Sequence, residues 1–485
     1  MAPSQLQKTD SVVIVGAGIF GLSTALHLAS RGYTNVTVFD RQNYDESMYS
    51  YQKGCDAASA DLNKIMRSAY GGQTEYQELS FEAIRDWKAW NDEISAGNIP
   101  PGMSRDDRVF INTGVMSLNE GTELPSFERA TIEGMVKHGH GDSQLSTTDA
   151  AHLQIAADKG FDMDQFRCQS RGQKVVGVMD TSGGVTIADK ACRFALHKAR
   201  ANGARFVFGP RAGGFASLVY EGGRVAGIKT RDGLTHGARL VVMACGGWTP
   251  SLVPQLDGLC ETTAGSVAVY RLPRRSAAFD RFGPDKFPVW MFKMRDGAGG
   301  GLYGFPRDDE GLLKIGYRGT KYTNPRPQAD GRERSVPVTR YTEGERLAEI
   351  PVQAMNTIAK FVADFMPELA EAGYDKVAFT RLCWYNDTFD NHFVVDRVPG
   401  QEGLMVATGG SGHAFKYLPN IGRWVADVVE GVGLERPAVK AWRWRELGRE
   451  ATPANVLMEG NKGPRALSNV PLTSMSTGYA VPAKL

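Results

Sequence analysis

A glycine-rich turn close to the N-terminus constrains the fold of this chain more than any other feature. Residues 11–15 are a mostly β-branched run that predicts a buried parallel strand. A glycine-rich turn follows, then apolar residues at helical spacing over 22–31 and a second predicted strand over 36–40. In such a βαβ unit the glycines let the backbone approach a pyrophosphate, and the helix N-terminus stabilises its charge. The turn therefore predicts a dinucleotide site formed by Gly16, Ala17, Gly18, Ile19, Phe20 and Gly21.

The end of the second strand supplies the next part of this site. Asp40 stands there and can accept a hydrogen bond from a ribose hydroxyl, with Arg41 beside it. These residues alone fit either NAD or FAD. A second glycine-rich segment, 240–248, lies more than 200 residues further along, and no second G-x-G-x-x-G turn follows a predicted strand. We therefore predict FAD, with Gly246 and Trp248 in its site.

The rest of the chain alternates between segments with the α/β pattern of the N-terminus and segments with a different pattern of predicted elements. This alternation indicates two domains. Further helices and strands of the N-terminal type are predicted at 187–202, 204–208, 217–220, 225–230, 240–244, 404–407 and 415–432. Residues 102–171 are expected to be rich in loops, whereas 262–382 mix strands, at 265–272 and 312–317, with a helix near 352–366. This pattern predicts an α/β Rossmann-like FAD-binding domain and an α+β substrate domain built on a mixed or antiparallel sheet.

Both predicted domains are discontinuous, because the substrate domain is inserted twice into the nucleotide domain. The predicted boundaries are 1–92, 173–261 and 384–446 for the FAD-binding domain, 93–172 and 262–383 for the substrate domain, and 447–485 for a C-terminal tail.

Composition excludes several other classes of protein. The 56 Lys and Arg nearly balance the 54 Asp and Glu, so no global charge attracts nucleic acid or an anionic membrane. Six cysteines without a C-x-x-C pair suggest neither a disulfide scaffold nor a zinc site, and we expect no metal. The polar residues 1–10 are followed by only a short apolar run, and no apolar stretch reaches 18 residues, so we expect neither a signal peptide nor a membrane span. The expected partners are small molecules.

The last three residues match a targeting signal. Ala483-Lys484-Leu485 matches the small-basic-leucine form of the peroxisomal signal, and a polar segment over 460–482 precedes it. We predict recognition by the peroxisomal import receptor, with a cytoplasmic protein as the alternative if the match is fortuitous.

Several motifs, which agree in order and spacing as well as in content, give the chain a resemblance to a known family. They are Gly16-Ala17-Gly18-Ile19-Phe20-Gly21, Asp61-Leu62-Asn63-Lys64-Ile65-Met66-Arg67, Gly304-Phe305-Pro306, Leu313-Lys314-Ile315-Gly316-Tyr317, Arg381-Leu382-Cys383-Trp384-Tyr385 and Gly410-Ser411-Gly412-His413-Ala414-Phe415-Lys416. With them the chain resembles the sarcosine oxidase family of FAD amine oxidases, particularly its fungal branch of fructosyl amino acid oxidases (amadoriases) and saccharopine or pipecolate oxidases. The resemblance implies oxidation of a secondary amine by FAD, with oxygen as the acceptor, to an imine and hydrogen peroxide. We expect a monomer.

The resemblance also implies roles for single residues on the flavin side. Cys383 matches the cysteine that links to the flavin through an 8α-S-cysteinyl thioether. Lys314 matches a lysine that promotes the reduction of oxygen, because a fixed ammonium stabilises superoxide as it forms. Gly410, Gly412 and His413 match the loop at the flavin edge, and we expect a helix that opens at 411–415 to stabilise negative charge there.

On the substrate side, the resemblance assigns Arg67 and Lys416 to the amino acid carboxylate, with Lys416 also close to the cofactor. Tyr70, Tyr303 and Tyr317 are implied as pocket walls. One departure concerns Arg318, because amadoriases usually carry an acidic residue at this position, four residues after the lysine. A basic residue there favours a secondary-amine amino acid without a sugar, such as sarcosine, pipecolate or saccharopine.

Other readings of the sequence stay open. A fructosyl amino acid oxidase is the alternative within the family, and an NAD-dependent dehydrogenase or a non-catalytic flavoprotein is the alternative of another class. The sequence does not fix the amine or the fate of the imine.

Overall fold

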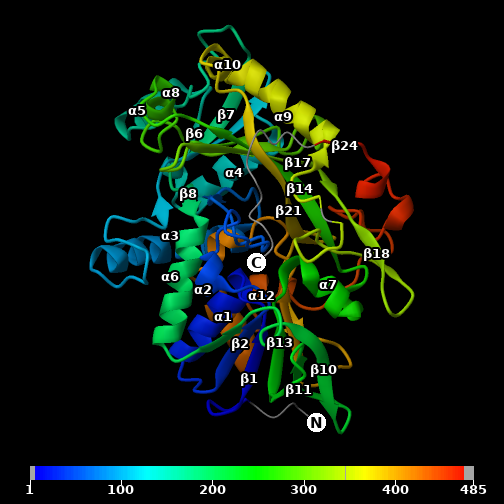
Figure 1. Cartoon of the computed structure of the whole chain (residues 1–485). Helices are drawn as coiled ribbons and strands as arrows, with labels where there is room; N and C mark the ends of the chain where they lie inside the picture. The colour runs from blue at the N-terminus through cyan, green and yellow to red at the C-terminus, as the bar shows by residue number, and fades with distance from the viewer. Residues whose placement is uncertain (1–5, 345, 474–485) are drawn as a thin grey trace.

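The fold described here is a computed structural model, which describes residues 6–344 and 346–473. It is built around two large sheets, one in each half of the molecule (Figure 1). No helix in these two ranges is long and apolar enough to cross a membrane. The predicted signal at 483–485 lies outside the described residues.

The first sheet is six-stranded and parallel except at one edge. β22 pairs antiparallel with β23, and the other neighbours are parallel. In spatial order the strands are β22 (Val394–Arg397), β23 (Leu404–Thr408), β13 (Leu240–Met243), β1 (Val12–Val15), β2 (Val36–Asp40) and β9 (Arg205–Phe208). β1 and β13 are buried along their whole length, as expected for parallel strands covered on both faces.

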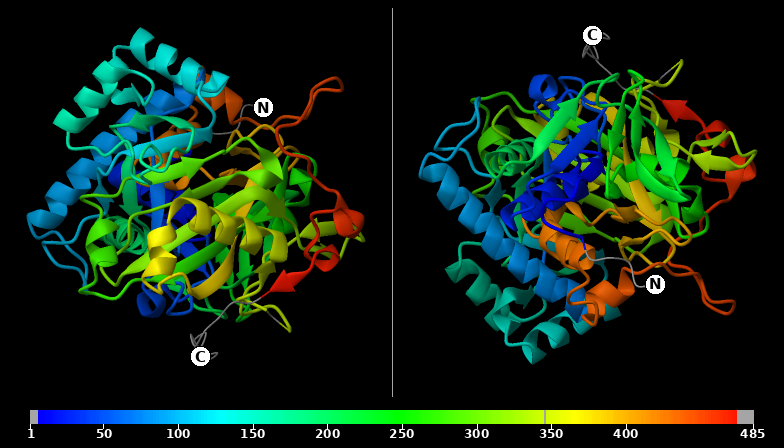
Figure 2. Two further views of the ribbon diagram at one scale, coloured as in Figure 1. Left: turned by 90° about the horizontal axis from the view of Figure 1, so that it is seen from above. Right: turned by 90° about the horizontal axis from the view of Figure 1, so that it is seen from below.

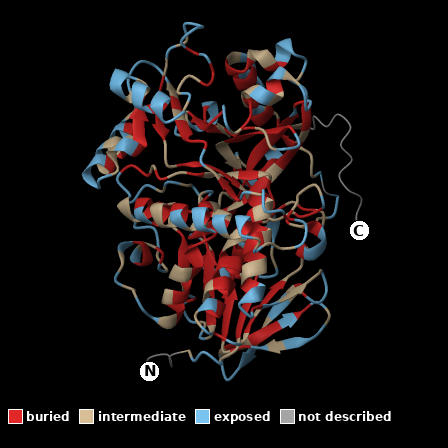
Figure 3. Ribbon diagram, turned by 90° about the vertical axis from the view of Figure 1, so that its left-hand side faces the viewer, coloured by how far each residue is buried: buried red, intermediate tan, exposed pale blue. Residues whose placement is uncertain are grey.

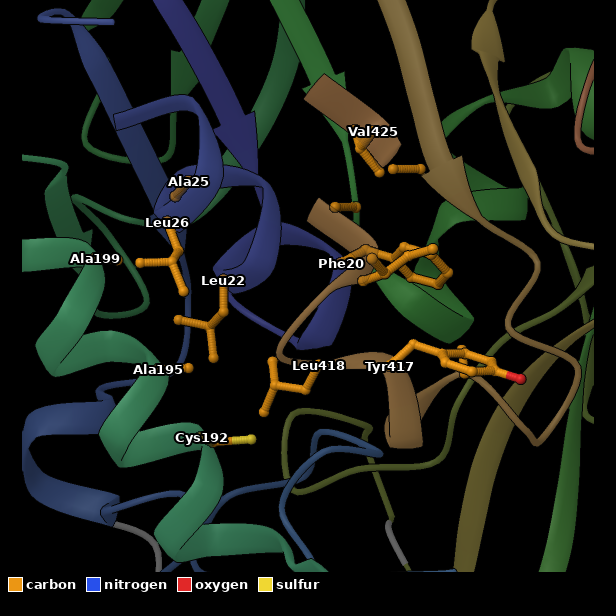
Figure 4. Close-up of a cluster of buried hydrophobic side chains, with 14 of the residues drawn as sticks. Phe20, Leu22, Ala25, Leu26, Cys192, Ala195, Ala199, Tyr417, Leu418 and Val425 are labelled. Carbon is orange, nitrogen blue, oxygen red and sulfur yellow. The ribbon is translucent and has the colours of Figure 1, made fainter. Parts of the chain in front are cut away.

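Helices cover one face of this sheet. α1 (Ile19–Ser30) packs between α6 (Ala188–Ala201) and α11 (Ile421–Glu430), and Figure 4 shows their apolar side chains meeting. The helices α1 and α11 approach closely at Gly422, where an added Cβ would lie 1.9 Å from the Ser23 carbonyl oxygen. The other face is covered by the antiparallel sheet of β10 (Phe215–Glu221), β11 (Arg224–Thr230) and β12 (Thr235–Gly237).

The second sheet has eight strands and is antiparallel except between β15 and β5. In spatial order they are β21 (Val377–Thr388), β14 (Cys260–Arg271), β17 (Leu312–Tyr322), β16 (Leu302–Gly304), β15 (Val289–Phe292), β5 (Val115–Glu120), β7 (Val175–Asp180) and β6 (Gln144–Ser146). α9 (Val352–Phe365) packs on one face of it, and α10 (Pro367–Glu371) follows. Buried residues concentrate in both sheets and in the inner faces of the helices (Figure 3).

The remaining elements join and flank the two sheets. The longest is α3 (Thr74–Ser95), which lies at the periphery in both views of Figure 2. A small sheet is formed by β3 (Asn63–Met66), β8 (Gly184–Ile187) and β4 (Phe110–Ile111). The others are α2 (Tyr44–Ser47), α4 (Ser126–Lys137), α5 (Ala150–Asp158), α7 (Thr249–Leu252), α8 (Ala277–Arg281), α12 (Pro437–Ala441), β18 (Pro325–Pro327), β19 (Glu333–Ser335), β20 (Ile350–Pro351) and β24 (Leu472–Thr473).

The segment 102–171 is rich in loops, as predicted, and also contains α4, α5 and three strands. Another sequence prediction is wrong in detail. No helix opens at 411–415: Ser411 and Gly412 have φ of 44° and 71°, in the left-handed region, and Phe415–Tyr417 form one 3₁₀ turn. The helix α11 starts only at Ile421, after a proline, so its dipole does not reach the loop at 411–413.

Candidate active site

A cavity of about 400 Å³ lies at the carboxyl ends of the six-stranded sheet, facing the eight-stranded sheet. We call it the inner cavity. Open parallel α/β sheets bind their ligands at this edge. It brings together most of the cofactor residues predicted from the sequence, namely Gly16, Gly18, Ile19, Phe20, Asp40, Arg41, Gly246, Trp248, Gly410, Gly412 and His413. Trp384, Tyr385 and Asn386 of β21 line its far end.

The predicted glycine turn is held tightly against the sheet. Gly16 has a φ of +103°, and an added Cβ would lie 2.4 Å from the Ala244 carbonyl oxygen. Ala17 and Gly21 do not line the inner cavity. The Ala17 N–H donates to Asp40 Oδ2 at 2.8 Å, and Gly21 lets α1 start against the Gly16 carbonyl. These two residues therefore position the wall of the cavity.

Asp40 and Arg41 form the opposite side of the inner cavity. Burial raises the pKa of the Asp40 carboxyl, which also accepts from the Gln42 N–H at 2.8 Å. The Arg41 guanidinium lies 4.2 Å from the Trp248 ring and 4.4 Å from the Tyr341 ring. An acceptor for hydroxyl groups and a stacked cation thus face the same space.

A second cavity of about 260 Å³, the outer cavity, adjoins the inner one at His413, which lines both. Arg67, Tyr70 and Arg318 line it as well. Its floor is the β5, β7 and β6 end of the eight-stranded sheet, and α4 supplies a further wall.

Three cations meet at the boundary of the two cavities. Arg67 lies over the Tyr70 ring at 4.7 Å and donates to the Ala69 carbonyl. Arg318 lies 3.5 Å from the carbonyl oxygens of Ser411 and Gly412, and the buried Lys416 Nζ donates to the Tyr70 hydroxyl at 2.9 Å. Across residues 6–344 and 346–473, none of the three cations has a carboxylate oxygen within 4 Å, although the charge of Asp180 reaches Lys416.

The uncompensated charge affects Lys416 most. Burial, together with the charges of Arg67 and Arg318, holds the pKa of the Lys416 amine well below its usual range. An anion bound between these side chains would restore the charged form. Three cationic side chains this close together suit an anionic group such as a carboxylate.

A chain of hydrogen bonds fixes the neighbouring histidine. His413 Nε2 lies 3.0 Å from the Asn391 carbonyl oxygen, so this nitrogen carries the proton. His413 Nδ1 then accepts from the Tyr70 hydroxyl at 2.8 Å, which in turn accepts from Lys416. Burial and the charge of Lys416 hold the pKa of His413 well below its ordinary value. Both ring nitrogens are engaged, so His413 orients Tyr70 and is not placed to act as a base.

A buried cluster lies beside the inner cavity. Asp61 Oδ2 is 2.7 Å from Lys64 Nζ and 2.9 Å from Lys314 Nζ, and Lys314 also donates to the Asn63 carbonyl at 2.6 Å. Burial lowers the pKa of Lys314 to about 8, although Asp61 opposes this shift. Burial would lower the pKa of Lys64 too, but the charge of Asp61 outweighs it and raises that pKa. Lys64 lines the inner cavity, and Lys314 stands behind it.

Cys383 belongs to the same cluster. It is buried on β21 directly before three residues that line the inner cavity, and its Sγ lies 3.8 Å from Lys64 Nζ.

The three predicted tyrosines occupy different places. Tyr70 lines the outer cavity. Tyr303 lines neither cavity, but its hydroxyl lies 3.3 Å from that of Tyr385, which lines the inner one. The prediction that Tyr317 forms a pocket wall is wrong: it is buried on the opposite face of β17 and donates to the Ala298 carbonyl at 2.9 Å. Alternation along the strand turns it away from Lys314.

Sequence reasoning missed several residues of the site. Asp61 and Lys64 stand in the quoted motif before Arg67, and their charges three residues apart were a usable signal. Glu128, Gln144 and Arg295 of the outer cavity had none, because they come from segments distant in the sequence.

Comparison with known proteins agrees with this geometry. Residues 11–428 match the family described as FAD dependent oxidoreductase (DAO). The chain belongs to this family. It is 27% identical over 448 residues to L-saccharopine oxidase of Schizosaccharomyces pombe. The alignment covers 90% of this chain and 93% of that protein.

Solved structures of relatives share the fold. The fructosyl peptide oxidase from E. terrenum aligns with a TM-score of 0.76 and 26% identity, covering 96% of this chain and 98% of that one. Amadoriase I from Aspergillus fumigatus aligns with a TM-score of 0.68 and 27% identity, covering 92% and 91%. The predicted family resemblance and fold class are therefore confirmed.

The side chains of this DAO family member fit FAD in the inner cavity. The turn at Gly16 and Gly18 and the start of α1 would hold the pyrophosphate, and Asp40 would accept from the ribose. At the far end, Asn386 lines the cavity, and its buried Oδ1 has no hydrogen-bond partner in the described part of the chain. A buried acceptor without a partner suits an N–H donor of a bound group.

Proposed function

We propose that this chain is an FAD-dependent oxidase of a secondary-amine α-amino acid, which yields an imine and hydrogen peroxide. The observation that carries the proposal is the set of three unpaired cations, Arg67, Arg318 and Lys416, at the junction of the two cavities. They would hold the amino acid carboxylate beside the cofactor. Relatives of this chain include an L-saccharopine oxidase and an N-methyl-L-tryptophan oxidase, both named for substrates of this chemical kind.

The side chains suggest how the substrate is oriented. The planar fork of Arg67 suits two carboxylate oxygens, and Lys416 adds a point charge. The positive charges also disfavour a protonated amine next to the carboxylate, so the amine would bind in its neutral form. When bound, FAD supplies an acceptor for the hydride equivalent from the C–H bond next to the substrate nitrogen, and it passes the two electrons on to oxygen. No base is required, consistent with the engaged nitrogens of His413.

We assign the reaction with oxygen to the cluster of Asp61, Lys64 and Lys314. A buried ammonium stabilises negative charge that develops on oxygen, because the low dielectric strengthens the interaction. Asp61 would keep two ammonium groups together beside the inner cavity.

We further propose that Cys383 forms the covalent link to the flavin. This proposal is supported by the burial of the thiol next to the inner cavity and by the 3.8 Å distance from its Sγ to Lys64 Nζ. The discontinuous domain boundaries, the monomeric state and recognition of Ala483-Lys484-Leu485 by the import receptor are also proposals, made from the sequence.

A fructosyl amino acid oxidase is the second candidate. The fructosyl peptide oxidase and amadoriase structures named above favour it. Arg318 argues for a substrate without a sugar, because it places a further cation where amadoriases usually carry an acid.

A panel of substrates tests the proposal. Peroxide release is measured with sarcosine, pipecolate, saccharopine and fructosyl-valine, and reduction of NAD⁺ by the same substrates is measured as the control for a dehydrogenase. We expect peroxide with at least one of the first three. Peroxide only with fructosyl-valine would support the second candidate, and reduction of NAD⁺ without peroxide would contradict both.

A further inference from the structure

The outer cavity contains polar groups that the carboxylate site does not use. Glu128 and Gln144 line it with exposed fractions of only 4% and 1%. Glu128 Oε2 and both polar atoms of the Gln144 amide are buried without a hydrogen-bond partner among residues 6–344 and 346–473. Since buried polar groups in native structures nearly always have hydrogen-bond partners, such a set indicates a missing ligand.

The sheet register explains how these side chains reach the cavity. Gln144 of β6, Asp180 of β7 and Val115 of β5 stand in one row across the sheet, and Ser117 stands one row further on the same face. The Ser117 hydroxyl donates to Glu128 Oε1 at 3.0 Å, which fixes the carboxylate of α4 above this floor. Glu128 is therefore held in place before any ligand arrives.

Arg295 lies next to Glu128. Its guanidinium stacks on the Phe127 ring at 3.3 Å, and its Nη1 is 3.7 Å from Glu128 Oε1. The side chain is 52% exposed. Stacking fixes the plane of the guanidinium and leaves its N–H edge available for an anion.

The other carboxylate in this cavity is already satisfied. Asp180 accepts from the Ser68 N–H at 2.7 Å and from the Ser182 hydroxyl at 2.6 Å. It supports the backbone after β3, and its charge acts on the buried Lys416. Glu128 and Arg295 thus present one negative and one positive group side by side.

We propose that Glu128 and Arg295 bind a second α-amino acid group at the far end of the substrate. Glu128 takes its ammonium, Arg295 takes its carboxylate, and the Gln144 amide hydrogen-bonds to either. A lone distal carboxylate would face the charge of Glu128, and a lone ammonium would face Arg295, whereas a zwitterion complements both. The substrate class is then an α-amino acid whose nitrogen carries a chain ending in a zwitterion. This inference rests on the proposed function.

Four N-substituted glycines of one length test this class. They are ε-N-carboxymethyl-lysine with a distal zwitterion, N-carboxymethyl-aminohexanoate with a distal carboxylate, N-carboxymethyl-cadaverine with a distal ammonium, and N-pentylglycine with no distal charge. We expect kcat/KM for the zwitterionic probe to exceed that for N-pentylglycine roughly 100-fold, since each charged hydrogen bond contributes about tenfold or more. Equal values for the two probes would overturn the proposal.

Two variants separate the two contacts. Glu128→Gln should lower kcat/KM about tenfold for the probes with an ammonium and leave the distal carboxylate probe unimpaired. Arg295→Gln should lower it about tenfold for the probes with a distal carboxylate and leave N-carboxymethyl-cadaverine unimpaired. Arg274→Gln, in an exposed ion pair with Glu310, is the control and should change none of the values. If only Arg295→Gln loses the preference for the zwitterionic probe, the site binds a distal carboxylate alone. That result would contradict the proposal of a zwitterion site.

Binding provides a readout that does not depend on turnover. The ligand for calorimetric titration is the analogue of ε-N-carboxymethyl-lysine that has sulfur in place of the secondary nitrogen. It should bind more weakly to Glu128→Gln and to Arg295→Gln than to the unaltered protein. Peroxide from N-pentylglycine with no preference among the probes would overturn this inference alone. No peroxide from any probe or from the substrates in the panel above would instead contradict the proposed function.

Discussion

Replacing Asp61 by asparagine tests how the buried cluster serves the reaction with oxygen. The Asp61 carboxylate lies 2.9 Å from Lys314 Nζ and opposes the burial that lowers the pKa of this amine to about 8. A pair of unit charges near 4 Å interacts by about 4 kcal/mol at an effective dielectric of 20, which corresponds to roughly three pH units. Lys64 shares the same oxygen, so we expect a smaller change, a fall in the pKa of Lys314 by at least about one pH unit.

The assay is the rate at which the reduced enzyme reacts with oxygen, measured by stopped flow across neutral and alkaline pH. In the unaltered enzyme the rate should fall as pH rises through about 8, because the Lys314 ammonium loses its proton. In Asp61→Asn this fall should move to lower pH. Asp257→Asn, which breaks the 2.7 Å ion pair with Arg334 outside both active-site cavities, is the control and should leave the profile unchanged.

Stability must be followed in parallel, because removing one partner of a buried ion pair typically costs about 3–5 kcal/mol. Circular dichroism and flavin content identify folded Asp61→Asn protein. A folded variant whose oxygen reaction has the same pH midpoint as the unaltered enzyme would refute the assigned role of Asp61.

Three further substitutions have distinct expected results. Lys314→Met should keep flavin reduction by substrate without air and slow the oxygen reaction about 100-fold or more, measured by stopped flow; equal loss of both half-reactions would refute the role. Cys383→Ser should give a colourless pellet on acid precipitation where the unaltered protein gives a yellow one, and two pellets of one colour would exclude this cysteine as the link. Gly422→Ala should lower the free energy of unfolding by about 1–3 kcal/mol in denaturant titrations, because its Cβ would meet the Ser23 carbonyl at 1.9 Å. Gly72→Ala, where no atom lies within 4 Å, is its control, and similar losses in both variants would contradict the packing argument.

The nucleotide-binding half was predictable from the sequence because its signals are local. The β-branched run at Val12–Val15 and the turn at 16–21 are contiguous, and each specifies its own conformation. The start of α11 was mispredicted, because apolar residues continue at helical spacing through 411–420. The left-handed φ of Ser411, which interrupts any helix there, is not visible in the periodicity of the sequence. The 22-residue helix α3 was not predicted, although its buried Tyr76, Ala83 and Trp87 keep helical spacing.

The substrate half was less predictable because its site depends on contacts between distant segments. The motif containing Lys314 identified the strand correctly. Side chains alternate along a strand, so Tyr317 lies on the face opposite Lys314, and this rule would have excluded it from the pocket. Glu128 and Arg295 are far apart in the sequence and meet only because α4 packs over the sheet beside the loop after β15. No local pattern marks either residue as part of a site.

The most direct test of the account mixes the flavin-bound enzyme with a secondary-amine amino acid in the absence of oxygen. We expect the visible absorbance of the flavin to bleach with the secondary amine, to stay unchanged with NADH, and to return on admission of oxygen with one peroxide formed per flavin. Bleaching by NADH, or no bleaching by any secondary-amine or fructosyl amino acid, would contradict the assignment as an amine oxidase.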